Sequence, residues 1–296
     1  MTDEAQTSRR LSLGTAQFGL PYGLANKFKQ VSAREAANIL TNAWISGIDS
    51  IDTAAGYGDS EAVLGSIGVN SWRVVSKLPA VPASCPDVND WFQRSVSAIM
   101  SRLRISGLYG LLLHQPSDLF GAHGAALYRA LLSSRDHGLV TKIGVSIYDP
   151  KELDCLTDRF PVELVQAPYS VVDRRLVSSG WLKRLAESGT EIHARSAFLQ
   201  GLLLMEPGSR PAYFERWRGL WQRWHDWLAS TGIPPVQACL RFTLGQQEIS
   251  KVVVGVNCVG QLKQLITAAG ANCQVPPADL AMEDVALVHP SAWPKS

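Results

Sequence analysis

Four polar residues in the first half of the chain follow apolar, strand-like runs, and their types are those used in proton transfer. Asp52 ends IDSID, Tyr57 lies in the loop AAGYGDS beyond it, Lys77 ends WRVVSK and His114 ends GLYGLLLH. Each alone has an ordinary structural explanation, because aspartate caps turns, a core histidine can be hydrogen-bonded, and a tyrosine can pack over a turn. An acid, a phenol, an amine and an imidazole at successive strand ends together indicate an acid–base site.

Such a set suits the reduction of a carbonyl group, which needs a hydride on carbon and a proton on oxygen. No side chain donates a hydride, so a nicotinamide would supply it. Tyr57 would be a better proton donor if its pKa fell by ~3 units from about 10, a shift of ~4 kcal/mol. An ammonium ~4 Å away, at an effective dielectric of about 20, supplies ~4 kcal/mol, so we expect Lys77 to acidify Tyr57. We expect Asp52 to keep Lys77 charged and His114 to polarise the substrate oxygen.

These residues need a fold that brings strand ends together. Strand-like runs alternate with helix-like segments, and several runs are apolar throughout, as in parallel strands covered on both faces. The strand candidates are 11–16, 48–54, 72–78, 107–114, 140–147, 162–169, 190–198 and 249–256. Eight strand–helix units predict a (β/α)8 barrel, an α/β fold in which the C-terminal strand ends surround the active site.

An open, doubly wound sheet is the alternative fold. It would normally carry GxGxxG after its first strand, whereas this chain reads GTAQFGLPYG there. The barrel is therefore favoured. No internal repeat or linker-like segment interrupts the 296 residues, so we expect a single barrel domain over 1–296.

Local signals mark two helix starts. Ser32 and Glu35 form a capping-box pattern before AANILTNAWISG, and Gly47 is the expected stop. The stretch from Asp149 to Glu152 predicts a second start, with Pro150 at the first helical position.

A tryptophan-rich insertion, residues 201–232, separates the seventh and eighth strand candidates. Trp217, Trp221, Trp224 and Leu228 recur at helical spacing and define one apolar face. The simpler interpretation is a helix packed on the barrel wall. The alternative is an oligomer contact or one wall of the substrate cleft, because aromatic side chains are enriched in both.

Composition narrows the classes of partner. The formal net charge is +2, with 46% hydrophobic and 18% charged residues, so nothing favours a nucleic-acid partner or an anionic membrane. The five cysteines have no metal-ligand spacing, which predicts reduced thiols and no metal site. The start MTDEAQTSRR lacks the apolar core of a signal peptide, and no apolar run reaches the ~18 residues of a membrane span. We expect a cytoplasmic protein that is a monomer or a weak homo-oligomer.

Several of these stretches resemble one known family. IDTAAGYGDSEAVLG, VVSKLP and LLLHQP are similar, in order, to three signature blocks of the aldo-keto reductases. KIGVSIY, VQAPYS, RSAFLQGLL and VVVGVN resemble the cofactor-binding segments of that family. The resemblance spans about residues 11–270. It implies a (β/α)8 fold, NAD(P)H-dependent reduction of an aldehyde or ketone, and the catalytic tetrad Asp52, Tyr57, Lys77 and His114.

The resemblance also implies which residues bind the cofactor. Ser146 and Gln166 match residues that hold the nicotinamide carboxamide, although Ile147 replaces the asparagine usual after that serine. The other matches are Gly14 and Thr15 near the reacting centre, Ser196, Phe198, Gln200 and Gly201 on the pyrophosphate side, and Gly255, Val256, Asn257 and Gln261 at the adenosine phosphate.

The preferred dinucleotide follows from the last of these segments. Relatives that bind NADP usually carry lysine or arginine there, because a dianionic 2′-phosphate prefers charged partners. Here the nearest cation in sequence is Lys263. Kinship still ranks NADP(H) ahead of NAD(H).

Arg195 departs from the family pattern, in which a tyrosine often stacks on the nicotinamide. A planar guanidinium can also stack, and it would disfavour the cationic oxidised ring. The other interpretation is an arginine paired with a nearby acid at the barrel mouth.

The expected partner is a small-molecule carbonyl substrate, bound by loops. Candidate pocket residues are Phe18, Tyr22, Tyr148, the tryptophan-rich insertion and residues 291–296. The opening GTAQFGLPYG resembles a bacterial branch associated with sugar and surface-glycan metabolism, which implies a sugar-type carbonyl. Two other functions stay open: a dinucleotide-binding regulatory or assembly barrel with little turnover, and a non-redox sugar lyase or isomerase.

Overall fold

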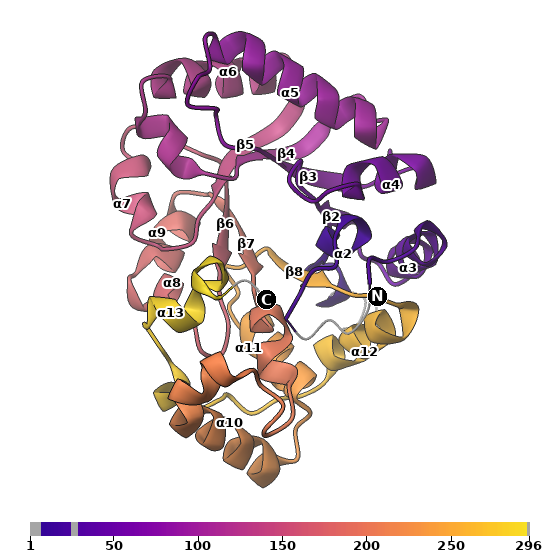
Figure 1. The fold of residues 1–296 in the computed structure, drawn as a ribbon, viewed down its shortest axis with the longest axis vertical. Helices are drawn as coiled ribbons and strands as arrows, with labels where there is room; N and C mark the ends of the chain where they lie inside the picture. Colours follow the sequence, from indigo (N-terminus) through magenta and orange to yellow (C-terminus); the bar gives the residue numbers. More distant parts are fainter. Residues whose placement is uncertain (1–6, 25–28, 295–296) are drawn as a thin grey trace.

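The computed structural model describes residues 7–24 and 29–294. Eight parallel strands form a closed barrel in chain order, and β8 pairs with β1 (Figure 1). The strands are β1 Leu11–Gly14, β2 Ser50–Asp52, β3 Arg73–Leu78, β4 Leu108–Leu113, β5 Val140–Ser146, β6 Leu164–Pro168, β7 Glu191–Arg195 and β8 Lys251–Gly255. The predicted (β/α)8 barrel is confirmed.

Helices follow the strands and surround the barrel (Figure 1). They are α3 Ala33–Ile45, α4 Ser60–Ile67, α5 Val88–Leu103, α6 Gly124–Asp136, α7 Glu152–Leu156, α9 Trp181–Glu187, α11 Pro235–Leu244 and α12 Val259–Gly270. Shorter helical segments lie at the strand ends and between these helices: α2 Ala16–Gly19, η1 Pro116–Phe120 and α8 Arg175–Ser178.

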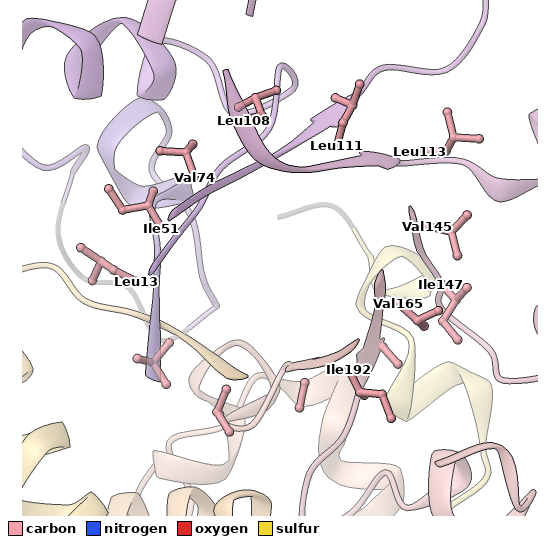
Figure 2. Packing of buried hydrophobic residues seen from close by; sticks show 14 of the residues in the cluster. Leu13, Ile51, Val74, Leu108, Leu111, Leu113, Val145, Ile147, Val165 and Ile192 are labelled. Atoms are coloured by element: carbon pink, nitrogen blue, oxygen red, sulfur yellow. The ribbon is translucent and has the colours of Figure 1, made fainter. Parts of the chain in front are cut away.

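Along each strand, successive side chains point alternately into the hydrophobic core outside the ring of strands and into the barrel interior. Apolar residues such as Leu13, Val145 and Ile192 point away from the centre of the ring of strands (Figure 2) and are fully buried in one cluster with residues of the helices. Their neighbours along the strands face the barrel interior instead. This period of two explains why Ile51 belongs to the core while Asp52 can line a cavity.

Three predicted strands end two or three residues earlier than expected, and the run 11–16 is one of them, since β1 ends at Gly14. The run 48–54 contains only the three residues of β2, and the run 190–198 ends at Arg195. At Ser196 the backbone turns into the left-handed region, with φ of 64°, so β7 cannot continue.

The two predicted helix starts have different outcomes. Ser32 accepts a hydrogen bond from the backbone N–H of Glu35 at 3.2 Å, and α3 begins at Ala33 as expected. However, the Glu35 carboxylate accepts from the N–H of Val259, at the start of α12, instead of turning back to Ser32. The other helix begins at Glu152 rather than Pro150. The carboxylate of Glu152 accepts the N–H groups of Tyr148 and Asp149, which holds the preceding residues in a turn.

The tryptophan-rich insertion forms a second hydrophobic cluster. It contains η2 Leu199–Leu204, η3 Ala212–Trp217 and α10 Arg218–Thr231, packed against the C-terminal segments η4 Ala278–Leu280 and α13 Val285–Val288. Trp217, Trp221, Trp224 and Leu228 are buried. The indole N–H groups of Trp221 and Trp224 donate to backbone carbonyls at 2.8 and 3.0 Å. These side chains therefore serve packing, against the C-terminal segment as well as the barrel.

No helix within the described parts of the chain is long and apolar enough to cross a membrane. Across the same residues, no group of three or more His, Cys, Asp or Glu side chains is arranged to hold a metal ion.

A close contact between backbones positions the loop that carries Tyr57. Helix α2 packs on this loop through Gly19, where an added Cβ would lie 1.8 Å from the carbonyl oxygen of Tyr57. At Gly58, which has φ of 54°, a Cβ would lie 2.5 Å from the Gly19 carbonyl oxygen. Only glycine permits this approach without a shift of the loop.

We predict that Gly19→Ala destabilises the protein by about 1–3 kcal/mol, because the new methyl group overlaps backbone atoms that have little freedom to move. The free energy of unfolding in urea measures the effect. The control is Gly56→Ala in the same loop, where an added Cβ meets nothing within 4 Å. Equal stability of the two variants would show that the contact does not hold the loop.

Candidate active site

A buried ion pair lies at the C-terminal ends of β2 and β3. The Lys77 Nζ atom donates to both carboxylate oxygens of Asp52, at 2.8 and 2.9 Å, and to the Thr53 carbonyl at 3.0 Å. Lys77 and Asp52 are 1% and 3% exposed. The three protons of the ammonium group are therefore all engaged, and water is excluded from the pair.

Gln166 ties this pair to the opposite side of the barrel. Its Nε2 atom donates to Asp52 Oδ1 at 2.6 Å, and its Oε1 accepts from Ser146 at 3.3 Å. Because β2 and β6 are not neighbours in the sheet, the first of these bonds crosses the barrel interior. The predicted proton-transfer and carboxamide-binding residues are thus in direct contact.

The other two members of the predicted tetrad lie above the ion pair. The rings of Tyr57 and His114 meet edge to face, with centroids 6.3 Å apart. Lys77 Nζ lies 5.1 Å from the centroid of the Tyr57 ring. The structure therefore brings all four residues together, as the sequence predicts.

The electrostatics differ from expectation at the phenol. Burial, with the charge of Asp52 as the next cause, raises the pKa of Tyr57, and Arg195 opposes this change. The expected acidification by Lys77 does not appear, since the ammonium is paired with Asp52. Burial lowers the pKa of Lys77 itself, although Asp52 counteracts the lowering.

His114 is neutral at physiological pH. Burial lowers its pKa to about 4, and the positive charges of Lys77 and Arg195 contribute to the lowering. A neutral imidazole can donate one hydrogen bond to a ligand oxygen without carrying a charge.

These residues face a cavity of about 520 Å³ at the barrel mouth, a size typical of small-molecule sites. Asp52, Tyr57 and His114 line it, while Lys77 lies outside its lining. All the residues assigned to the cofactor by resemblance also line it: Gly14, Thr15, Ser146, Gln166, Arg195, Ser196, Phe198, Gln200, Gly201, Gly255, Val256, Asn257 and Gln261.

The loop after β7 has an unusual backbone conformation of the kind found around bound ligands. Ser196, Leu199 and Gln200 adopt φ of 64°, 47° and 53°, which is uncommon for residues other than glycine. Such strain persists mainly at functional sites. At the far end of the cavity, Asn257 Oδ1 is buried without a hydrogen-bond partner among the described residues. Both features fit an extended dinucleotide that carries phosphates and hydroxyl groups.

Arg195 makes no ion pair with any described acid. Its guanidinium lies 4.2 Å from the centroid of the Tyr148 ring and donates to the Ile147 carbonyl at 2.9 Å. It also donates to Ser196 Oγ at 3.3 Å. The described residues therefore do not provide the acid-paired arrangement, and the ring on which the guanidinium lies is that of Tyr148. Stacking on a nicotinamide stays a prediction.

The predictions for the pocket wall are partly wrong. Tyr22 and Tyr148 line the cavity, whereas Phe18 is fully buried in the core because α2 turns its ring inward. The tryptophans of the insertion are absent from the described lining. The described part of the C-terminal tail, residues 291–294, is not part of the lining, and residues 295–296 lie outside the described residues. Just before the tail, the His289 ring packs on Tyr148 with centroids 4.3 Å apart.

Sequence reasoning missed several contributors. Four further side chains line the cavity: Gln17, Val236, Gln264 and Leu265. Only Gln264 and Leu265 had a signal, since they follow Gln261 by one helical turn. Glu35 gave only a capping signal, although it contacts α12, which is 224 residues away.

Comparison with known proteins indicates the same family as the sequence motifs. The aldo/keto reductase family profile matches residues 10–283. The chain is 27% identical over 294 residues to the D-threo-aldose 1-dehydrogenase of a Pseudomonas species, covering 85% of this chain and 89% of that one. It is 21% identical over 283 residues to YqkF, an uncharacterized oxidoreductase of Bacillus subtilis (strain 168), with 89% and 92% coverage.

A solved structure agrees on the fold. The holo form of an aldo-keto reductase from Bacillus halodurans superposes with a TM-score of 0.71 at 18% identity, covering 90% of this chain and 88% of that one. At this identity the likeness shows the (β/α)8 fold alone. Together with the family match over residues 10–283, it shows that the chain belongs to the aldo-keto reductase family.

Proposed function

We propose that the protein interconverts an aldehyde or ketone and the corresponding alcohol, with a nicotinamide dinucleotide as hydride carrier. One observation carries this proposal: a phenol and a neutral imidazole lie over a buried ammonium–carboxylate pair at one wall of a cavity. A bound nicotinamide supplies the hydride in reduction and accepts it in oxidation. Ser146 and Gln166 are suited to hold its carboxamide, and kinship ranks NADP(H) ahead of NAD(H).

Tyr57 is the proposed proton donor during reduction. Its raised pKa keeps the phenol protonated until negative charge develops on the substrate oxygen. The alkoxide that develops on the substrate oxygen is a strong base, so it can take the proton even from a phenol whose pKa is raised. Arg195, the cation that opposes the rise in the pKa of Tyr57, then stabilises the phenolate that remains.

A sugar-type carbonyl is the proposed substrate class. The curated relative at 27% identity is named a D-threo-aldose 1-dehydrogenase, and the cavity wall presents polar groups suited to hydroxyls. Among them, Gln200 Nε2 donates to Tyr22 Oη at 3.3 Å. Assays of NADH and NADPH oxidation with aldehydes, and of NAD⁺ and NADP⁺ reduction with aldoses, test the proposal. Dinucleotide binding without turnover would favour a regulatory barrel, and reaction without dinucleotide a lyase or isomerase.

We predict that Tyr57→Phe lowers kcat/KM by about 10²–10⁴-fold, because the proton donor is removed, while dinucleotide affinity changes little. Steady-state assays and a binding titration measure the two effects. The matched control is Tyr128→Phe, which removes a phenol bonded to the Pro161 carbonyl on the barrel exterior. Near-normal turnover in Tyr57→Phe would contradict the assigned role.

We predict that His114 contributes stability above pH ~6.5 that is lost as the pH falls toward about 4. The unfolded imidazole titrates near 6.5 and the folded one near 4. Between these values the unfolded state binds more protons, so acid favours unfolding by up to about 3 kcal/mol. Urea unfolding at pH 7 and pH 4.5 measures the loss. His114→Asn should reduce this pH dependence, and an unchanged difference would contradict the assignment.

We predict that Arg195→Tyr strengthens binding of the oxidised dinucleotide about fivefold more than binding of the reduced one. A guanidinium close to the nicotinamide disfavours its positive charge by ~1 kcal/mol in a water-like dielectric. Titrations with both redox forms measure the difference. Equal changes for the two forms would place Arg195 away from the ring.

A further inference from the structure

The adenosine end of the cavity has no basic side chain among the residues described. It is lined by Gly255, Val256, Asn257, Gln261 and Gln264. Arg195 is the only lysine or arginine in the described lining, and it lies at the nicotinamide end, beside Ile147 and Tyr148. A 2′-phosphate placed at the adenosine end would therefore lack the charge-assisted partners that such a dianion needs.

A carboxylate already holds the start of α12 at this end. The Oε1 atom of Glu35, in the first turn of α3, accepts a hydrogen bond from the N–H of Val259 at 2.9 Å. Val259 is the first residue of α12 and stands two positions after Asn257. The first turn of a helix attracts anions through its free N–H groups. Here the protein's own anion uses one of these donors.

No described cation neutralises Glu35. Its carboxylate forms no ion pair within the described residues, and Oε2 has a weak contact with the side-chain amide of Asn38 at 3.5 Å. Arg34 and Lys263, the nearest cations along the two helices, are solvent-exposed. The negative charge of Glu35 therefore lies at the start of α12, two residues beyond Asn257, although Glu35 itself is not part of the described cavity lining.

The polar atoms nearby include an oxygen that lacks a hydrogen-bond donor. Asn257 Oδ1 is buried and has no hydrogen-bond partner in the described chain. Gln261 Oε1 already accepts from the Asn257 N–H at 2.7 Å, so Asn257 Oδ1 is the oxygen there that still lacks a donor within the described chain. A ribose 2′-hydroxyl can donate a hydrogen bond to such an oxygen, whereas a dianionic phosphate can only accept.

We infer that Glu35 makes the protein prefer NAD(H) over NADP(H), by repelling a 2′-phosphate at the start of α12 and favouring a 2′-hydroxyl. This inference rests on the proposed function, and it reverses the order of the two cofactors that kinship suggests. Glu35 acts here as a specificity-determining residue with no part in proton transfer.

Binding titrations of NAD⁺ and NADP⁺ to the full-length protein test the inference, because the two ligands differ only by the 2′-phosphate. At low salt we expect NAD⁺ to bind about tenfold or more tightly than NADP⁺. Glu35→Gln keeps an oxygen that can accept the Val259 N–H but removes the charge. This substitution should reduce the ratio of NAD⁺ affinity to NADP⁺ affinity by about tenfold, mainly through tighter NADP⁺ binding.

Two further measurements separate electrostatic discrimination from a structural effect. Glu187→Gln, a matched charge removal at an exposed site on α9, should leave both affinities unchanged. Added salt should reduce the ratio of NAD⁺ affinity to NADP⁺ affinity in the native protein, because salt screens the repulsion between Glu35 and the 2′-phosphate. In Glu35→Gln, added salt should change this ratio little. This salt series does not depend on how well the variant folds.

The outcomes are distinguishable. Tighter NADP⁺ binding by the native protein, a salt-independent ratio, or an equal change of both affinities in Glu35→Gln would overturn the inference and leave the proposed function intact. Failure of both dinucleotides to bind would overturn the proposed function, and the inference with it.

Discussion

The ion pair between Lys77 and Asp52 is the interaction on which the site depends. Burying two charges is costly, and it is tolerated only where hydrogen bonds satisfy both groups. Thr53 and Gln166 complete those bonds, so the pair fixes the ends of β2 and β3 and reaches β6 across the barrel. Loss of one partner would leave an isolated charge in a dry interior, which typically costs about 3–5 kcal/mol.

This pairing also determines how the phenol can work. An ammonium whose protons all bind other groups cannot donate one to Tyr57, and Asp52 cancels much of its field. Burial, with the charge of Asp52 as the next cause, therefore makes the phenol a weaker acid than in water, which suits a group that must stay protonated until the substrate oxygen becomes basic. Arg195, with no acid paired to it among the described residues, is the cation that opposes the rise in the pKa of Tyr57.

Local periodicity predicts the barrel and the strand ends that surround the cavity, whereas the residues on the cofactor side of the cavity are assigned by resemblance to the aldo-keto reductases. Asp52, Lys77 and His114 are recognisable since each stands at the end of an apolar run, and strand ends of a closed parallel barrel meet at one face. The lengths of β2 and β7 are less predictable, because left-handed residues such as Ser196 end a strand without a glycine signal. The roles of Glu35 and Phe18 are set by contacts between distant segments, which composition and spacing do not encode.

The hydrogen bond from Gln166 to Asp52 has a consequence for the ancestry of such chains. The predicted tetrad lies between the last residue of β2 and the residue that follows β4, whereas Ser146, Gln166 and Arg195 come from β5, β6 and β7. Recombination between relatives at the β4–β5 junction would exchange one half-barrel and leave each set of residues whole. Asp52 and Gln166 stand on opposite sides of that seam, so a viable chimera must inherit compatible residues at both positions.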